Sequence, residues 1–573
     1  MNKRKILLPF ILMLSLTLSG CNLSSATDKI FSFFNNNEET QENVTDGTKG
    51  DNQGENQEQG EETGEEDEEE TVDYEIPKDK VGEFYGGLVN DNIHVGYEFS
   101  ASLEAIKKPK SGEGEVKIYS FNDFHGAVLE NDQEAGLKAF ASYYKEKSVE
   151  DNTLIFDQGD TWQGSLESNS SYGGIVQDVF NYAGVSLRTV GNHDFDWGLD
   201  HLEETINRKL GDDYTPCLAA NVYDYANGVT GTTQQSQYGK EYATFILENG
   251  IKVGVVGVIG QLMSSICSNR IETVNFTNPK DKIMEMSDYL RINKKCDIIV
   301  ASTHNSVSYF MDETLMGVSP NSHQRYVDVV LGGHEHYRQD YTENGIKFSQ
   351  SDSHGQSSAI TTLKYDFSKK CLKDEIGYEV MNRADYEVYS TTKLDSTINE
   401  MVDEYLVKVD EIGNEVLSRN FNGFYSTSTL ARLMCEAIFE TVKDSGYDID
   451  YSNTNGARDS FYGNVFTYRD LYRCFPFDNE IVLMEVKNEG HPIGYRPNIY
   501  DPVDFNKEYF NCAIIDYVAL HQNFYREYDN YPDEIVKSRT IFKGENGEVI
   551  TYRDMLKEFL LANPDRDFSS SNI

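Results

Sequence analysis

The chain has 573 residues, which is too long for one hydrophobic core, so we expect two or more folded domains. Its formal net charge of −45 argues against a nucleic-acid polymer as partner, because phosphate backbones are bound by positive charge. A small phosphate ester stays compatible with this charge where metal ions supply the positive charge.

The first 21 residues predict a secretory signal. Lys3, Arg4 and Lys5 precede a short apolar run over residues 6–18, and the sequence LSGC ends at Cys21. This run is too short for a spanning helix and is followed by polar sequence. LSGC is similar to the bacterial lipoprotein signal, so we expect an extracytoplasmic protein held on the cell membrane through a lipidated Cys21. The alternatives are an uncleaved anchor and an ordinary secretory signal, and both also lie outside the cytoplasm.

Residues 35–75 are rich in Glu, Gln, Asn, Gly and Thr and contain the run EETGEEDEEE. With almost no apolar residues they cannot offset their ordering entropy, which predicts a disordered acidic tether over residues 22–80. Residues 81–115 regain aromatic side chains and are interpreted as an accessory segment to which the sequence assigns no role.

From residue 116, apolar strands alternate with helical patterns. We expect strands at 116–122, 153–157, 187–191, 216–222, 296–303 and 327–333, helices at 134–148 and 199–209, and two strands joined by an Asn249–Gly250 turn within 242–258. This alternation predicts an α/β layered domain over residues 116–390. A linker helix is expected within 391–418, and a second domain over 419–573.

Polar residues of one chemical type follow the predicted strands. They are Asp123 and His125, then Asp160, then Asn192, His193 and Asp196, then His304, and finally His334 and His336. Each motif alone is weak evidence. Five of them in order, containing five of the eleven histidines, predict one functional site at the edge of a sheet rather than five unrelated turns.

The side-chain types indicate which ligand such a site would hold. Carboxylate, amide and imidazole groups without cysteine suit borderline or hard divalent metals, whereas a structural zinc site more often uses thiolates. One carboxylate shared between two sets of ligands would make a centre of two ions, of Zn, Mn, Mg or Ca. Such a centre activates a water and binds phosphoryl oxygens.

The stretches NDFHG, GDTWQGS, GNHDFDWG and GGHEH resemble the calcineurin-like metallophosphoesterases, and within them the 5′-nucleotidase family. The resemblance implies a four-layer β-sandwich flanked by helices, followed by a smaller α+β substrate-binding domain. It implies that Asp123, His125 and His336 hold one metal, that Asn192, His304 and His334 hold the other, and that Asp160 bridges them. His193, oriented by Asp196, would stabilise the transition state or protonate the leaving oxygen.

Two positions near these motifs are interpreted separately. Asp194 stands where the family has Glu, and we expect it to brace its loop. His354, in SDSHG, could line the site, but a surface-loop position is favoured.

The second domain indicates a substrate through NTNGARDSFYG and CFPFDNE, which resemble the family's substrate-binding domain. The resemblance places Asn453 and Arg458 on the phosphate and ribose side, and Phe477 and Asn479 at the base. The remaining candidates are Tyr517 as a second aromatic, Asn523 in place of the family's Asp, and Arg432 as a displaced arginine. Arg offers a bidentate fork to anionic oxygens, and an aromatic face stacks on a nucleobase.

The sequence thus predicts an extracellular dinuclear-metal phosphohydrolase that releases phosphate from nucleotides. A 2′,3′-cyclic nucleotide, a nucleotide sugar or another phosphate ester is the alternative substrate. An alternative of another class is a degenerate fold that serves as a surface binding module.

Overall fold

The computed structural model describes residues 84–225, 233–235, 238–454, 456–488, 504, 506–520, 535–544 and 546–573. The predicted signal peptide with Cys21, the predicted tether and Asn523 lie outside these ranges. Among the described residues, no helix combines the length and apolarity that crossing a membrane requires.

A six-stranded sheet has the strand order β17–β16–β3–β4–β5–β6. Its strands are β3 (Glu113–Phe121), β4 (Thr153–Asp157), β5 (Leu187–Thr189), β6 (Cys217–Leu218), β16 (Ser357–Asp366) and β17 (Cys371–Asn382). Strands β3 to β6 run parallel, so their carboxyl ends meet at one edge. Side chains alternate along β3: Val116 and Ile118 face one core, whereas Tyr119 and Phe121 face another.

An eight-stranded sheet has the order β1–β2–β9–β10–β12–β13–β15–β14. Its strands are β1 (Tyr85–Asn90), β2 (Val95–Ser100), β9 (Tyr242–Ile246), β10 (Lys252–Ile259), β12 (Ile298–His304), β13 (Val329–Leu331), β14 (Gln339–Glu343) and β15 (Ile346–Gln350). The expected hairpin about Asn249–Gly250 joins β9 to β10. Strand β2 pairs parallel to β9, so residues 85–100 of the accessory segment extend this sheet.

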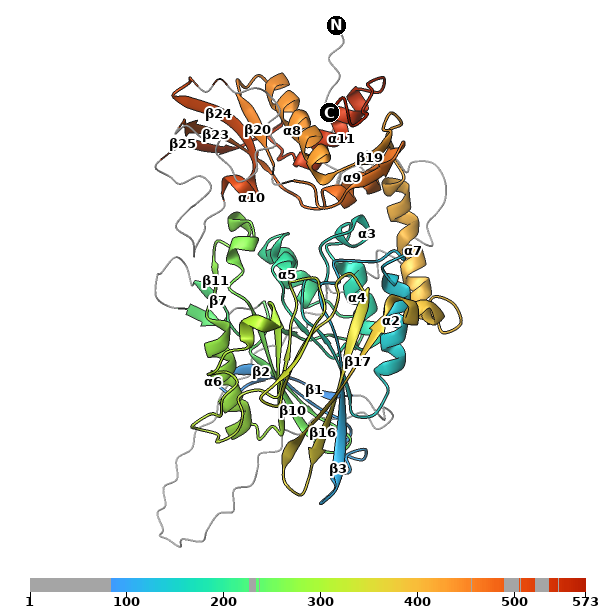
Figure 1. Cartoon of the computed structure of the whole chain (residues 1–573), viewed down its shortest axis with the longest axis vertical. Coiled ribbons are helices and arrows are strands. Elements are labelled where there is room, and N and C mark those ends of the chain that lie inside the picture. The colour runs from blue at the N-terminus through green and yellow to red at the C-terminus, as the bar shows by residue number, and fades with distance from the viewer. Residues whose placement is uncertain are drawn as a thin grey trace, which may run out of the picture. The chain divides into compact units, whose positions relative to one another are not determined.

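The two sheets pack face to face and helices cover their outer faces. Helices α2 (Gly136–Lys147), α4 (Gly174–Ala183) and α7 (Ser396–Gly413) share a core with the six-stranded sheet, and α6 (Pro279–Ile292) shares one with the eight-stranded sheet. Figure 1 shows α6 and α2 on opposite sides of the sheets. The expected four-layer sandwich is confirmed. Helix α2 forms because Leu137, Phe140, Ala141 and Tyr144 recur at helical spacing and are buried.

The strand expected over 216–222 is interrupted. Strand β6 ends at Leu218, and β7 (Val222–Tyr225) belongs to a small sheet with β8 (Thr233–Gln235) and β11 (Val274–Phe276). Asn221 explains the break, because its side-chain amide donates hydrogen bonds to the carbonyls of Ile259 and Thr277. These bonds direct the chain away from the six-stranded sheet.

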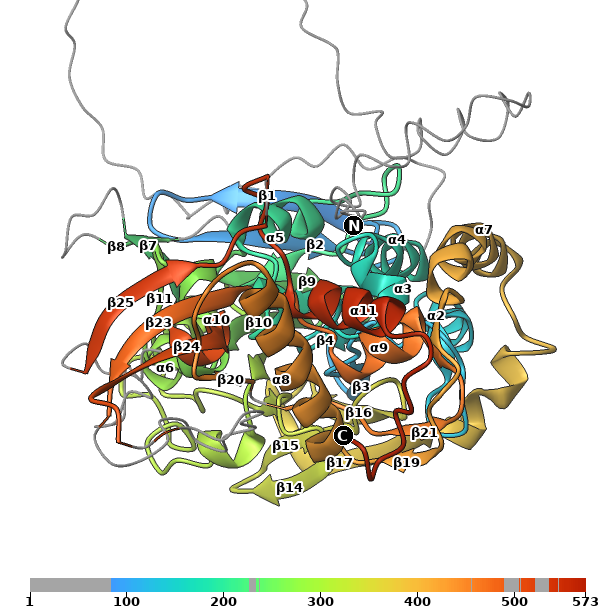
Figure 2. The ribbon, with the colours of Figure 1, turned by 90° about the horizontal axis from the view of Figure 1, so that it is seen from above.

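After α7, the chain forms an α+β domain around one hydrophobic core. Its four-stranded sheet has the order β20–β24–β23–β25, with β20 (Tyr451–Asn453), β23 (Ile481–Lys487), β24 (Tyr509–Ile515) and β25 (Val536–Ile541). Its helices are α8 (Thr427–Asp444), α9 (Tyr468–Cys474), α10 (Asp516–Ala519) and α11 (Tyr552–Ala562). Two short strand pairs complete it: β18 (Val416–Ser418) with β22 (Phe466–Thr467), and β19 (Gly423–Tyr425) with β21 (Phe461–Gly463). Helix α8 lies beside β20 and β24 (Figure 2).

Candidate metal centre and substrate cavity

The polar motifs lie where parallel strands end. Asp123 and His125 follow β3, Asp160 follows β4, Asn192 follows β5, His304 is the last residue of β12, and His334 and His336 follow β13. Because the strands of each parallel set end at the same edge, the fold gathers these loops into one place.

Asp123, His125 and His336 form the first group of side chains able to hold a cation. His125 Nε2 lies 3.1 Å from His336 Nε2, and His336 Nε2 lies 3.4 Å from Asp123 Oδ1. The Nδ1 of His125 is 2.8 Å from the carbonyl oxygen of Gln163, which can only accept. The proton therefore sits on Nδ1, and the lone pair of Nε2 faces the group.

Asp160, His304 and His334 form the second group. His304 Nε2 lies 3.2 Å from Asp160 Oδ2. The side-chain Oδ1 of Asn192 lies 3.2 Å from His304 Nε2 and 3.0 Å from His334 Nδ1. His304 Nδ1 donates to the carbonyl of Gln158 at 2.7 Å, which fixes its ring as Gln163 fixes that of His125.

Asp160 lies between the two groups. Its Oδ2 is 3.2 Å from His304 Nε2 and 3.8 Å from His125 Nε2 and is buried. No described residue forms a hydrogen bond with it. A buried carboxylate oxygen without a partner is costly unless a cation satisfies it. This oxygen, flanked by imidazole nitrogens on both sides, fits a shared ligand of two divalent ions.

Electrostatics favour the cation-binding protonation states at three of these side chains. Burial raises the pKa of Asp160, but His304 and His193 outweigh burial and hold the pKa well below its usual value. Burial lowers the pKa of His334 to about 4 and that of His125 well below its usual value. His304 differs: burial lowers its pKa, but Asp160 and Asp123 outweigh this and raise the pKa to about 10. Cation binding at the second group therefore displaces a proton from His304.

The backbone at this edge is strained. Five of the seven candidate ligands have positive φ: Asp123 (50°), His125 (49°), Asp160 (52°), His334 (79°) and His336 (58°). Such a conformation costs on the order of 1–3 kcal/mol for a residue other than glycine and persists where the surroundings fix it. Close packing helps to fix the conformation of Asp160: Gly191 lies so near that a Cβ on it would come within 2.2 Å of Asp160 Oδ1.

Asp194 ties two of the loops together. Its carboxylate is buried and accepts the backbone N–H groups of Gly191 at 2.8 Å, Thr161 at 3.0 Å and Asp160 at 3.2 Å. The expected bracing role of Asp194 is thereby confirmed.

His193 and Asp196 form a separate pair beside the metal groups. His193 Nδ1 lies 2.8 Å from Asp196 Oδ2, and the backbone N–H of His193 donates to Asp160 Oδ1 at 2.7 Å. Burial lowers the pKa of His193, but Asp196 and Asp160 outweigh burial and raise the pKa above its ordinary value. The imidazole therefore holds a proton readily beside the metal groups.

A cavity of about 240 Å³ opens at this pair. Its lining residues are Asn192, His193, Asp196, Ser265, Cys267, Arg270, His334, Arg458, Phe477, Asp478, Asn479, Asp516 and Tyr517. The ring of Phe477 stacks on that of His193 with centroids 5.5 Å apart, and the guanidinium of Arg458 lies 5.5 Å from the Phe477 ring. Four of the expected substrate residues thus line one cavity with the His193–Asp196 pair.

Two expected substrate residues do not line it. Asn453 is buried in β20, and Arg432 is exposed on α8. Asn523 lies outside the described residues.

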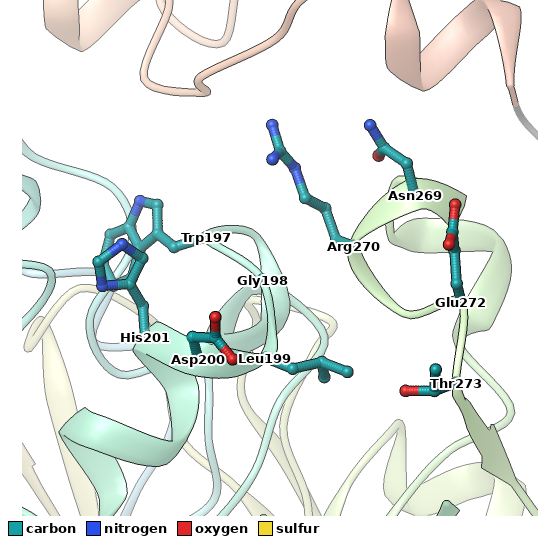
Figure 3. Close-up of a pocket in the computed structure, with 9 residues that line it drawn as sticks. All are labelled: Trp197, Gly198, Leu199, Asp200, His201, Asn269, Arg270, Glu272 and Thr273. Atoms are coloured by element: carbon teal, nitrogen blue, oxygen red, sulfur yellow. The ribbon is translucent and has the colours of Figure 1, made fainter. Parts of the chain in front are cut away.

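A second cavity of about 430 Å³ lies next to the first and shares Arg270 with it (Figure 3). Its lining residues are Trp197, Gly198, Leu199, Asp200, His201, Asn269, Arg270, Glu272 and Thr273. Trp197 packs edge-on against Tyr172, whose ring stacks on His201 at 3.8 Å. This cavity therefore has aromatic side chains beside Arg270.

Residues 116–338 match the calcineurin-like phosphoesterase family. This match covers less than half of the chain and lies within the first of its two folded domains. Protein UshA of Yersinia enterocolitica is 23% identical over 442 residues, which cover 67% of this chain and 76% of UshA. Endonuclease YhcR of Bacillus subtilis is 24% identical over 441 residues, which cover 70% of this chain, so the match spans only 34% of YhcR.

The fold of both domains is also that of solved 5′-nucleotidases. The crystal structure of a 5′-nucleotidase precursor from Thermus thermophilus superposes with a TM-score of 0.59 at 16% identity, covering 78% of this chain and 96% of that one. The resemblance of the sequence motifs to the calcineurin-like phosphoesterases is confirmed for residues 116–338, and the fold expected for the two domains is confirmed as well.

Sequence reasoning missed several residues around the phosphoesterase site. Arg270, Asp478 and Asp516 line the substrate cavity. Asp478 lies within the quoted stretch CFPFDNE but was not singled out, and no quoted motif contains Arg270 or Asp516. The interpretation of His354 as a surface-loop residue was wrong: its ring centroid lies 5.1 Å from that of His125, and its backbone N–H donates to the carbonyl of Asp123. The SDSHG motif is the signal that could have placed it.

Proposed function

We propose that this chain hydrolyses phosphate esters of nucleotides with two divalent ions. Three arrangements support the proposal together: the two ligand groups that meet at Asp160, the His193–Asp196 pair beside them, and an aromatic-lined cavity that opens onto both. The position of Asp160, with a buried carboxylate oxygen between two sets of imidazoles, is the single observation that carries it.

The residues of the site would take different roles in this reaction. Asp123, His125 and His336 would hold one ion, Asn192, His304 and His334 the other, and Asp160 both. When bound, the ions supply Lewis-acid activation of water and of the phosphoryl group. His193 delivers a proton to the leaving oxygen, and Asp196 keeps its Nδ1 protonated and its ring oriented. The raised pKa of His193 fits this role, because it favours the protonated imidazole that the leaving oxygen needs.

The cavity would bind the nucleoside part of the substrate. Phe477 and Tyr517 offer aromatic faces to a nucleobase, and Arg458 offers its guanidinium to anionic oxygens. Base stacking on such faces contributes about 1–3 kcal/mol per base in single-strand binders. For Asn453 and Arg432, a role in substrate binding rests on the family resemblance alone.

We also propose that the protein acts outside the cytoplasm, anchored to the membrane through a lipidated Cys21, and releases nucleoside and phosphate from external nucleotides for uptake. The basic residues, short apolar run and LSGC sequence of the N-terminus support this location. Palmitate labelling of the wild-type protein and of C21A tests it, because only the wild type would be labelled.

The second cavity favours one further candidate, a nucleotide sugar or another ester with a group beyond the phosphate. Its aromatic residues and the shared Arg270 could receive such a group. A 2′,3′-cyclic nucleotide is a third substrate for the same chemistry. A degenerate binding module is disfavoured, because all seven candidate ligands are present and converge.

Phosphate release from a panel of nucleotides, cyclic nucleotides and nucleotide sugars tests the proposal, with and without chelator and with added Mn or Zn. We expect release from nucleoside monophosphates that chelator abolishes. Metal-loaded protein that releases phosphate from no substrate would support the binding module instead.

A further inference from the structure

Asp516, at the start of α10, is a buried carboxylate that the proposed mechanism does not use. Its Oδ1 accepts hydrogen bonds from Asn479 Nδ2 at 2.7 Å and from the backbone N–H of Tyr517 at 2.8 Å. Its Oδ2 is buried and has no hydrogen-bond partner among the residues that the structure describes. Because an unsatisfied buried carboxylate oxygen costs free energy, a ligand that donates to it gains affinity.

The surroundings of Asp516 indicate what kind of ligand this is. Asp516 lines the substrate cavity together with Phe477 and Tyr517, the two aromatic residues proposed to hold a base. Among the described residues, Arg270 is the cation paired with Asp516: its Nη2 lies 3.8 Å from Asp516 Oδ2, beyond hydrogen-bond distance, and already donates to the carbonyl of Asp478. Arg270 therefore leaves the acceptor capacity of this oxygen unfilled.

Asn479 adds a second acceptor at the same edge. Because its Nδ2 donates to Asp516, the orientation of its amide is fixed and its Oδ1 is left to accept. Asn479 lines the same cavity. Two neighbouring acceptors require two neighbouring donors on the ligand.

We propose that Asp516 and Asn479 select a 6-oxopurine, and guanine above all. The inference rests on the proposed nucleotide substrate and names the base that it carries. Guanine presents a ring N–H beside an exocyclic amino group, which matches the two acceptors. Hypoxanthine keeps the ring N–H and lacks the amino group. Adenine presents one amino group beside a ring nitrogen whose lone pair would face an acceptor oxygen.

The test compares kcat/KM for guanosine, inosine and adenosine 5′-monophosphate. For the wild type we expect the order guanosine, inosine, adenosine, with about ten- to hundred-fold between the first and the last, since a well-formed pair of base contacts is worth that much. Equal values, or a preference for adenosine, overturn the proposal.

The variant D516N sharpens the test. Its Oδ1 must still face the donors Asn479 Nδ2 and Tyr517 N–H, so its new amide nitrogen points where Oδ2 was. The substitution thus replaces the acceptor Oδ2 with a hydrogen-bond donor at the same position. We expect kcat/KM for the guanosine substrate to fall about ten- to hundred-fold while that for the adenosine substrate stays level or rises. An unchanged ratio between the two substrates overturns the proposal.

Two controls separate this result from misfolding and from failure of the proposed function. E480Q removes a carboxylate that also lies near Arg270, at 3.7 Å, but does not line the cavity, so its base preference should match the wild type. Hydrolysis of p-nitrophenyl phosphate, which has no base, should fall by a much smaller factor in D516N than hydrolysis of the guanosine substrate, and it should be equal in E480Q and the wild type. If the protein hydrolyses p-nitrophenyl phosphate and no nucleotide, the proposed function fails. Calorimetry with guanosine and adenosine then tests the role of Asp516 by itself. Tighter binding of guanosine supports that role, and equal or absent binding of the two nucleosides overturns it.

Discussion

The carboxylate of Asp194 accepts the backbone N–H of Asp160 at 3.2 Å and so ties the loop after β5 to the residue that lies between the two ligand groups. The same carboxylate accepts the N–H groups of Thr161 and Gly191. Asp194 belongs to neither ligand group, yet it holds the loop that carries Asp160. The geometry of the candidate metal centre therefore depends on a residue outside the ligand set.

D194N should weaken metal binding. An amide retains one acceptor oxygen but turns the other into a donor that faces a backbone N–H, so the loop loses part of its support. We expect about 10- to 100-fold weaker metal affinity with the fold retained. Metal titration followed by mass spectrometry measures it. D196N is the matched control, since the Asp196 carboxylate bonds to the ring of His193, which belongs to neither ligand group, and this variant should keep its ions.

H193A should lower turnover by about 10²- to 10⁴-fold, because the leaving oxygen loses its proton donor. The metal content should remain near two ions, since neither ligand group includes His193. Steady-state kinetics and metal analysis on the same preparation check both points. Loss of metal along with activity would show that His193 supports the centre rather than the reaction.

Single ligand substitutions should differ in how many ions they release. D160A removes the carboxylate between the groups, and we expect both ions to be lost. H336A removes a ligand of the first group only and should leave about one ion bound. Metal stoichiometry of the purified variants decides this, and equal loss in both variants would contradict the bridging role of Asp160.

F477A should raise KM for nucleotides about 5- to 150-fold, which corresponds to the loss of about 1–3 kcal/mol of base stacking. Hydrolysis of ribose 5-phosphate should change little, because this substrate has no aromatic ring to stack. A parallel loss on both substrates would mean that Phe477 acts through its contact with His193 instead, whose ring lies 5.5 Å away.

The metal centre could be predicted from the sequence because its residues are tied to strand ends. Asp123 and His334 each follow an apolar run that forces a parallel strand, so the sheet itself brings them together. Asp516 and Arg270 could not be found in this way. Asp516 begins α10 in the second domain and Arg270 ends a short helical turn at residues 268–270 of the first, so only the packing of segments distant in sequence makes them line one cavity. His354 was considered from its motif, but only the packing of its loop against His125 places it at the site.

The accessory strand β2 is held by a buried carboxylate, and this contact predicts a pH-dependent stability. Glu241 accepts from Lys282 Nζ at 2.8 Å, contacts His94 Nδ1 at 3.1 Å and accepts the N–H of Val95 at 2.9 Å. Burial raises the pKa of Glu241, but the hydrogen bonds from His94 and Lys282 outweigh burial and hold the pKa below its ordinary value. A depressed carboxyl pKa stabilises the fold above its unfolded value of about 4.3, and this stabilisation is lost as the pH falls through the folded value.

E241Q should therefore lower the free energy of unfolding by about 1.5–3 kcal/mol at pH 7, the range for hydrogen bonds to charged groups. The difference from the wild type should shrink as the pH falls below about 4, where the wild-type carboxyl also becomes protonated. Urea unfolding at both pH values measures it. E285Q is the control, since Glu285 also pairs with Lys282, at 3.1 Å, but is 54% exposed and should contribute less than about 1 kcal/mol. A difference that stays constant with pH would place the effect of E241Q in packing rather than in charge.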